Sequence, residues 1–87
     1  MPVSHTSLIE RIARIIAARI VSANAEGSDP SAASLVDTIW RDYRDEALSV
    51  IRTLREPDPA MAEVGDVATW ERMVEAALSG AEADAAS

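Results

Sequence analysis

Apolar and polar residues alternate with the 3.6-residue period of an α-helix in three separate stretches of the chain. The first stretch follows Ser7, which with Glu10 has the spacing of a capping box, where each side chain bonds the other residue's backbone amide. We therefore predict a helix that begins directly after this serine and fades near Asn24, where turn-forming residues follow. Its apolar side chains share one arc of about 160°, opposite Arg11 and Arg14: Leu8, Ile9, Ile12, Ala13, Ile15, Ile16 and Ile20.

The second stretch is the longest and predicts a helix over residues 30–55. Asp29 and Pro30 are residue types preferred at the N-cap and at the first helical position, although a start nearer Ser34 also fits the pattern. Pro57 ends the helix, because the residue before a proline is biased away from the helical conformation. The apolar side chains span about 160° again, and we expect this helix to be the central one: Leu35, Val36, Ile39, Trp40, Tyr43, Ala47, Val50, Ile51 and Leu54.

Two further start signals follow. Asp58 and Pro59 repeat the earlier Asp-Pro pair, and Gly65 is the residue type that commonly follows a helix end, so we expect one or two helical turns over residues 59–64. Asp66 can then cap a last helix. The apolar residues of that helix recur at helical spacing: Val67, Trp70, Met73, Val74, Ala77 and Leu78.

The end of the chain carries no such pattern. Gly80 should end the last helix, and residues 81–87 are small and acidic, so we expect them to be disordered. The sequence as a whole predicts an all-α fold, a small three-helix bundle with an additional short helical turn, in a single domain over residues 1–80. Trp40 and Trp70 both lie in apolar stripes and are expected in its core.

Several motifs stand in a fixed order along residues 8–80. Residues 9–14 read Ile-Glu-Arg-Ile-Ala-Arg, residues 55–57 read Arg-Glu-Pro, and residues 70–78 read Trp-Glu-Arg-Met-Val-Glu-Ala-Ala-Leu. In these motifs the chain resembles a scattered group of short helical proteins of alphaproteobacteria and their phages. The resemblance implies a bacterial cytoplasmic or mobile-element setting and supplies no activity. The matching positions are Trp40, Tyr43, Arg55, Glu56, Pro57, Met61, Trp70, Met73, Ala77 and Leu78.

The net charge of −7 belongs to the last third of the chain. Residues 1–55 hold seven arginines and seven acids, whereas residues 56–87 hold eight acids against Arg72 alone, and lysine is absent throughout. Binding to nucleic acid depends on neutralising phosphates with Lys and Arg, so this balance disfavours it. The chain has no apolar run of 18 residues, no basic segment ahead of an apolar one and no cysteine, so we expect a cytoplasmic protein without membrane contact.

The residues needed for catalysis are missing. His5 is the single histidine and lies near the N-terminus, and neither Cys nor Lys is present to act as a nucleophile beside a base. A Glu-x-x-His metal motif and a glycine-rich phosphate loop are absent too, so we predict no enzyme, no metal and no cofactor. Asp42, Asp45 and Glu46 alternate with arginines on one helix, which predicts a solvated face of ion pairs.

This elimination favours a small protein-interaction module, and a homodimer is a further expectation. Val21 and Leu48 lie outside their apolar arcs and are candidates for a helix–helix interface. Two alternatives stay open. One is a phage or mobile-element inhibitor whose acidic surface imitates nucleic acid. The other is a helix-turn-helix regulator, which the acids of its recognition helix disfavour. The candidate partner surface consists of Glu63, Asp66, Glu71, Glu75 and Glu82.

Overall fold

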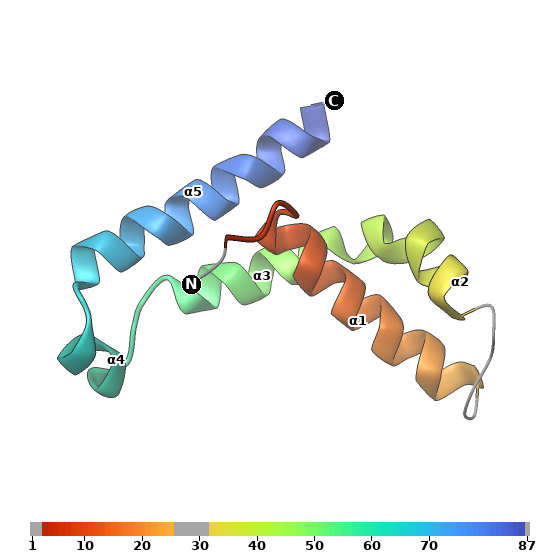
Figure 1. The fold of residues 1–87 in the computed structure, drawn as a ribbon, viewed down its shortest axis with the longest axis horizontal. Helices are drawn as coiled ribbons and strands as arrows, with labels where there is room; N and C mark the ends of the chain where they lie inside the picture. Colours follow the sequence, from red (N-terminus) through yellow and green to blue (C-terminus); the bar gives the residue numbers. More distant parts are fainter. Residues whose placement is uncertain (1–2, 26–31, 87) are drawn as a thin grey trace.

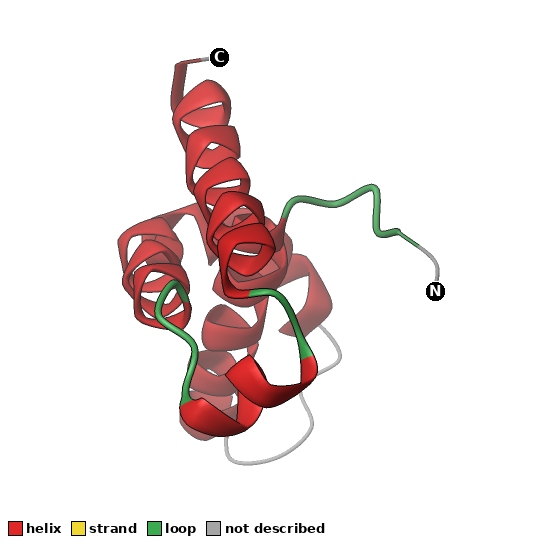
Figure 2. Ribbon diagram, turned by 90° about the vertical axis from the view of Figure 1, so that its left-hand side faces the viewer, coloured by secondary structure: helices red, strands yellow, loops and turns green. Residues whose placement is uncertain are grey.

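The computed structural model describes residues 3–25 and 32–86, and the elements within these ranges are all helical. They are α1 (Leu8–Ala25), α2 (Ala32–Ile39), the 3₁₀ helix η1 (Trp40–Tyr43), α3 (Arg44–Leu54), α4 (Pro59–Val64) and α5 (Val67–Ala86). Figure 2 shows helices joined by short loops, with a loop at the N-terminal end that leads away from the helices. The predicted all-α fold and the additional short helix are confirmed.

The segment of α2, η1 and α3 is the central part of the fold. Helix α1 packs along all three of these elements, and α5 packs mainly on α3 and to a smaller extent on α1 (Figure 1). The predicted central role of residues 30–55 is therefore confirmed for residues 32–54. Three fully buried alanines in the core, Ala13, Ala17 and Ala47, let α1 and α3 approach closely. The core cluster consists of Ile9, Ala13, Ala17, Trp40, Ala47, Ile51 and Val74.

The start of α1 agrees with the prediction, but its buried face is rotated. The Ser7 hydroxyl accepts a hydrogen bond from the Glu10 amide (3.1 Å), while the Glu10 carboxylate accepts from Arg14 Nε (2.8 Å), so one half of the capping box forms. Val21, expected outside the buried face, is buried, whereas Ile15 is 64% exposed. The prediction weighted large residues, and the actual contact face is built on small ones. The α1 residues buried are Ile9, Ala13, Ala17 and Val21.

The continuous helix predicted over residues 30–55 is wrong, because η1 interrupts it. A 3₁₀ helix has about 3.0 residues per turn instead of 3.6, so one apolar arc cannot extend unbroken across it. As a result Leu48, expected outside the arc, packs against the core, while Val50, expected inside, is 42% exposed. The chain turns away after Leu54, as Pro57 predicts. The Asp29-Pro30 start lies outside the described residues.

Helix α4 forms where the Asp-Pro pair predicts it. Asp58 Oδ1 accepts a hydrogen bond from the Met61 amide (3.0 Å), and Pro59 occupies the first turn. Gly65 ends the helix in an extended conformation (φ −147°, ψ 175°), which any residue adopts. None of the six residues of α4, all of which are described, is buried. In Figure 1, α4 lies at one end of the molecule, so packing contributes little to it.

Replacing Gly65 with alanine is expected to raise the free energy of unfolding by about 0.4–1 kcal/mol, because alanine restricts the unfolded chain. The added Cβ would lie 3.8 Å from the Met61 carbonyl oxygen, an ordinary van der Waals distance. Urea denaturation measures the change. The control is Gly80→Ala, whose Cβ meets no atom within 4 Å and which should stabilise α5 by a similar amount. A loss of stability in the Gly65 variant alone would show that this glycine is required.

Helix α5 continues past its predicted end. Gly80 lies inside the helix, which runs to Ala86, so the stop predicted at Gly80 is wrong. A single glycine in a helix costs about 1 kcal/mol relative to alanine, and no proline follows here to end the helix. The structure gives helical backbone to residues 81–86 of the segment expected to be disordered, and Ser87 lies outside the described residues. The start of α5 at Asp66 is confirmed.

Candidate binding cleft

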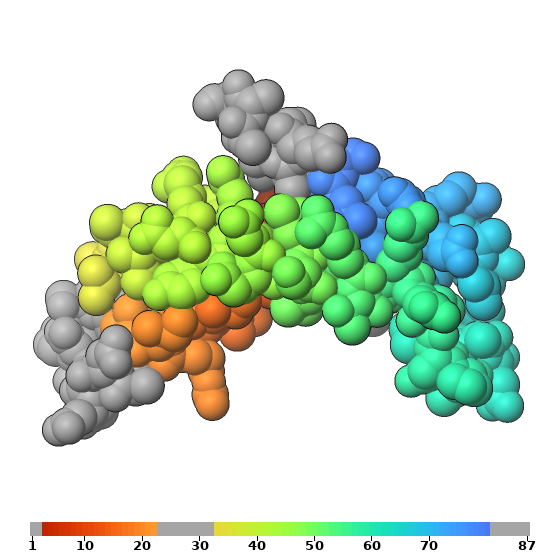
Figure 3. Space-filling view, turned by 180° about the vertical axis from the view of Figure 1, so that it is seen from behind, coloured from red at the N-terminus to blue at the C-terminus, as the bar shows by residue number. Residues whose placement is uncertain are grey.

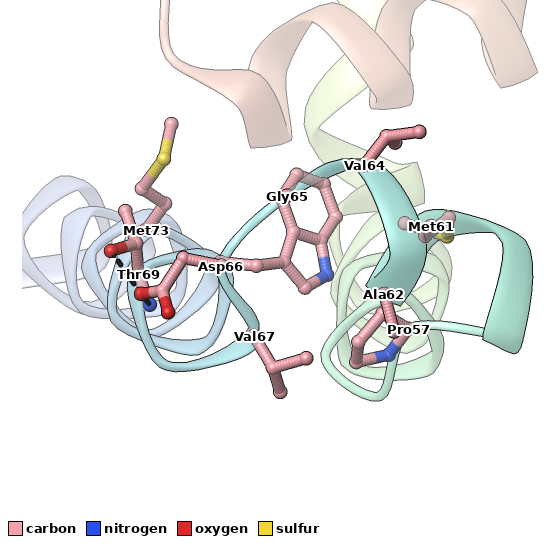
Figure 4. Close-up of a pocket in the computed structure, with 10 residues that line it drawn as sticks. Pro57, Met61, Ala62, Val64, Gly65, Asp66, Val67, Thr69 and Met73 are labelled. Carbon is pink, nitrogen blue, oxygen red and sulfur yellow. Dashed lines mark hydrogen bonds between the residues drawn. The ribbon is translucent and has the colours of Figure 1, made fainter.

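An apolar cleft of about 370 Å³ lies between α4 and the first turns of α5. Figure 4 shows how two short segments face each other across it: Pro57, Met61, Ala62 and Val64 on one side, and Val67, Thr69 and Met73 on the other. Figure 3 places both segments at one end of the molecule, beyond α3. The complete lining of this α4–α5 cleft is Pro57, Met61, Ala62, Val64, Gly65, Asp66, Val67, Thr69, Trp70 and Met73.

The walls of the α4–α5 cleft are apolar side chains that remain exposed. Val64 is 88% exposed and Met73 61%, and both Met61 and Val67 retain more than a third of their surface. Scattered exposed apolar residues are ordinary on a protein surface, but four that line one cleft form a contiguous patch. Methionine is flexible and polarisable, so a wall built on Met61 and Met73 adapts to apolar groups of different shape.

Trp70 connects the cleft to the core. Its Nε1–H donates a hydrogen bond to the Leu54 carbonyl at the end of α3 (2.6 Å), and the half-buried ring packs against the core cluster. Because the polar atom of the indole is satisfied, the rest of the ring can lie in an apolar wall. The prediction that Trp70 belongs to the core is thus correct for one part of the side chain, and the other part lines the cleft.

Asp66 is the charged residue of the lining, and its carboxylate has a structural role. Oδ2 accepts hydrogen bonds from the Thr69 amide (2.8 Å) and the Thr69 hydroxyl (2.6 Å), which caps α5. These bonds stabilise the ionised form and lower the pKa of Asp66 below its usual value of 3.8. The carboxylate therefore carries its full charge at neutral pH, at the edge of an apolar cleft.

The cap at Asp66 predicts that the wild type and a variant without this carboxylate differ in stability, and that the difference depends on pH. Since the folded-state pKa lies below the unfolded one, the stabilisation is complete above the unfolded value near 3.8 and is lost as the pH falls through the lowered value. We expect Asp66→Asn to unfold at a lower temperature than the wild type at pH 6, with the gap narrowing between pH 4 and pH 2. Thermal melting followed by circular dichroism measures it. A gap that is constant over this range would contradict the assignment.

The five acids of the predicted partner surface do not act as one patch. Asp66 is a cap, and the Glu75 carboxylate forms an ion pair with Arg55 Nη2 (2.6 Å). Glu63 and Glu71 are exposed, on α4 and α5 respectively, and the Glu82 side chain lies outside the described residues. Sequence reasoning missed the apolar lining beside these acids. The signal in the sequence for this lining was the presence of Met61 and Val64 in a helix too short to bury them.

A second cluster surrounds Trp40, which is buried as predicted. The guanidinium carbons of Arg14, Arg41 and Arg44 lie 5.4, 4.6 and 5.5 Å from the centroid of its ring, within the range of cation–π contacts. Arg14 also bonds Glu10 and Asp37. The Arg44 Nε is buried and has no hydrogen-bond partner among the described residues, while the guanidinium group lies over the ring.

The prediction for residues 41–46 is correct for the solvated face and wrong for its ion pairs. Asp42, Asp45 and Glu46 are exposed, but Arg41 and Arg44 lie over Trp40, and no ion pair within residues 41–46 occurs in the described part of the chain. The aromatic ring competes successfully for the guanidinium groups because contacts between exposed opposite charges contribute little. The arginines thus cover a core residue and stabilise the fold.

Among the side chains that the structure describes, no three His, Asp or Glu come together as metal ligands. None of the helices described is long and apolar enough to cross a bilayer. Comparison of the chain with protein-family models, curated proteins and solved structures gave no match. The resemblance to short alphaproteobacterial and phage proteins therefore stays a prediction.

Proposed function

We propose that this chain is a small cytoplasmic protein-interaction module without catalytic activity, and that a partner protein inserts apolar side chains into the α4–α5 cleft. The observation that carries the proposal is the cleft itself, in which Val64 and Met73 are largely exposed beside the half-buried Trp70. Interfaces concentrate their binding energy in central apolar and aromatic anchors of this kind. The remaining lining would exclude water around the contact.

A protein partner suits this cleft better than a small molecule. Small-ligand sites enclose most of the ligand and place several polar groups to orient it. Here the walls are open to solvent, and the polar side chains of the lining are Asp66 and Thr69, which already bond each other. An open apolar cleft is typical of grooves that accept side chains from a helix or an extended peptide.

The two alternative functions have less support. An imitation of nucleic acid needs acids available on one face, yet Asp66 and Glu75 are engaged within the chain. A helix-turn-helix regulator would present α5 to phosphates with Glu71 and Glu75 against Arg72. Homodimer formation no longer draws on Val21 and Leu48, because both pack inside the monomer.

Removal of the exposed cleft walls should abolish partner binding without unfolding the protein. We expect peptides selected from a random displayed library on the wild-type chain to lose at least about tenfold in affinity, or about 1.4 kcal/mol, for the Val64→Ser, Met73→Ser double variant. Both side chains are mostly exposed, so the free energy of unfolding should change by less than about 1 kcal/mol. Calorimetry measures affinity, and amide chemical shifts locate the contact.

The matched control is Ile15→Ser with Val50→Ser, which removes exposed apolar area on α1 and α3. This control should bind the selected peptides like the wild type. Equal losses in both double variants, or shift changes outside the α4–α5 cleft, would show that another surface binds. A failure to select any peptide that contacts the cleft would remove the proposed function.

A further inference from the structure

We propose that the segment filling the α4–α5 cleft is a basic amphipathic helix of another protein; this inference rests on the proposed function and specifies its partner. The charges around the apolar opening are almost all of one sign. Residues 56–73, which include the whole lining, carry five acids against the single Arg72. Those acids are Glu56, Asp58, Glu63, Asp66 and Glu71.

Two of these charges are fixed at the cleft by the fold. Asp58 and Asp66 are the N-caps of α4 and α5, and their carboxylates accept hydrogen bonds from the amides of Met61 and Thr69, which line the cleft. A cap loses its hydrogen bond if the carboxylate moves away. The negative potential at the opening is therefore a consequence of how the two helices begin, and it is present whenever the cleft is formed.

Two further acids flank the cleft. Glu63 and Glu71 are exposed and adjoin Val64 and Trp70 in the chain. Neighbouring Cα atoms are about 3.8 Å apart, and charges act over a Debye length of about 8 Å at physiological salt, so both side chains contribute to the potential at the opening. Of the nearby cations, Arg55 pairs with Glu75. Arg72, whose Nη2 donates to the Thr69 hydroxyl (3.2 Å), keeps its charge and offsets one of the five acids, which leaves four excess negative charges over residues 56–73.

The size of the cleft favours a helix of another protein over a second copy of this chain as its occupant. The exposed face of α1 is basic and carries Ile15 between Arg11 and Arg19, so it matches the cleft in charge. Ile20 is also exposed (37%), but it lies five positions after Ile15 and on a different side of the helix, so this face offers one large apolar side chain to a cleft of about 370 Å³. A helix with apolar residues at i, i+3 or i+4 and i+7 presents three such side chains along one face, with cations beside them.

Three designed peptides test this inference. Each is a helix of about 15 residues with leucines at i, i+3, i+4 and i+7, and the flanking positions are all Arg, all Gln or all Glu. We expect the Arg peptide to bind at least about tenfold more tightly than the Glu peptide at an ionic strength of about 0.01 M, with the gap shrinking at about 1 M. Calorimetry gives the affinities, and the Trp70 indole N–H resonance reports occupancy of the cleft.

Charge variants of the protein provide the matched comparison. Glu63→Gln with Glu71→Gln should reduce the preference for the Arg peptide by about threefold or more, whereas Asp45→Asn with Glu46→Gln, exposed acids on α3, should leave it unchanged. Equal binding of all three peptides would overturn the inference that the partner is basic, while the proposal that the cleft is a docking site would stand. Absence of binding by any peptide would instead remove the proposed function.

If a second copy of this chain occupied the α4–α5 cleft, the experiments would give a different result. The mass by light scattering would then rise with concentration and return to the monomer in Arg11→Glu with Arg19→Glu. That outcome would overturn the inference, because the basic segment would belong to this chain. A mass that stays monomeric, together with preference for the Arg peptide, supports a basic helix from another protein.

Discussion

Replacing Trp40 with alanine is expected to lower the free energy of unfolding by about 3–5 kcal/mol. The indole is 4% exposed and belongs to the core cluster, so its removal leaves a large cavity. Three guanidinium groups would lose the ring they lie against, including that of Arg44, whose buried Nε has no hydrogen-bond partner among the described residues. Since domains are stable by about 5–15 kcal/mol, this loss removes a large part of the stability, and nearly all of it at the lower end of that range.

Urea denaturation followed by far-ultraviolet circular dichroism measures the loss at Trp40. Trp40→Phe should fall between the wild type and the alanine variant, because it retains an aromatic ring and leaves a smaller cavity. Met73→Ala is the control for shortening a large apolar side chain at an exposed site and should change the free energy of unfolding by less than about 1 kcal/mol. A loss below about 1 kcal/mol for Trp40→Ala would contradict the packing described for η1.

Replacing Ala13 with leucine is expected to lower the free energy of unfolding by about 1–3 kcal/mol. Ala13 is fully buried on the face of α1 that packs against the other helices, and no space is available for a longer side chain without moving them apart. The effect should also broaden the dispersed methyl resonances of the core, because several contacts must rearrange together.

Ala18→Leu is the matched control for Ala13→Leu. It makes the same change in the same helix, and since leucine and alanine both favour helix, the local propensity changes little. Ala18 is exposed, so the variant should unfold within about 0.5 kcal/mol of the wild type. Similar losses at both positions would show that leucine disturbs α1 itself rather than the contact between helices.

The ends of the helices were more predictable from sequence than their faces. Local rules apply at an end: Ser7, Asp58 and Asp66 each accept a hydrogen bond from an amide three residues later, as their residue types indicate. Gly80 is the exception. A glycine permits a helix to end but does not force it to, and the residues after Gly80 continue the helix to Ala86. The faces depend on the neighbours, and a periodicity count gives large residues more weight than the small ones that form a close contact.

The interruption at η1 is a second feature that depends on neighbouring elements and that the sequence pattern did not predict. Nothing between residues 36 and 47 marks a break, since neither proline nor glycine occurs there. The change to a 3₁₀ turn accompanies the burial of Trp40 and the placement of three arginines around it, and this is a tertiary contact between α1 and the start of α3. An apolar arc drawn across such a turn is misaligned in α3, where it includes the exposed Val50 and leaves out Leu48, which packs against the core.

The charge of the candidate site was predictable from the sequence, but its shape was not. The acids of residues 56–87 are evident from the sequence, but whether they surround an apolar opening depends on how α4 folds back beside α5. The helical spacing places Met73 in the apolar stripe of the last helix, and it predicts only a short helical turn for Met61 and Val64. A six-residue helix at the end of the molecule offers no core to cover them, so these side chains stay exposed.

The lack of buried residues in α4 has a thermodynamic consequence for binding. Opening such a helix exposes little apolar surface, so it should open locally at a free energy well below that of global unfolding. The cleft then exists in only a fraction of the native ensemble, and the apparent Kd of a partner equals the intrinsic Kd divided by that fraction. Substitutions that hold α4 closed therefore tighten binding without touching the partner, and a bound partner slows amide exchange in α4 before it affects the core.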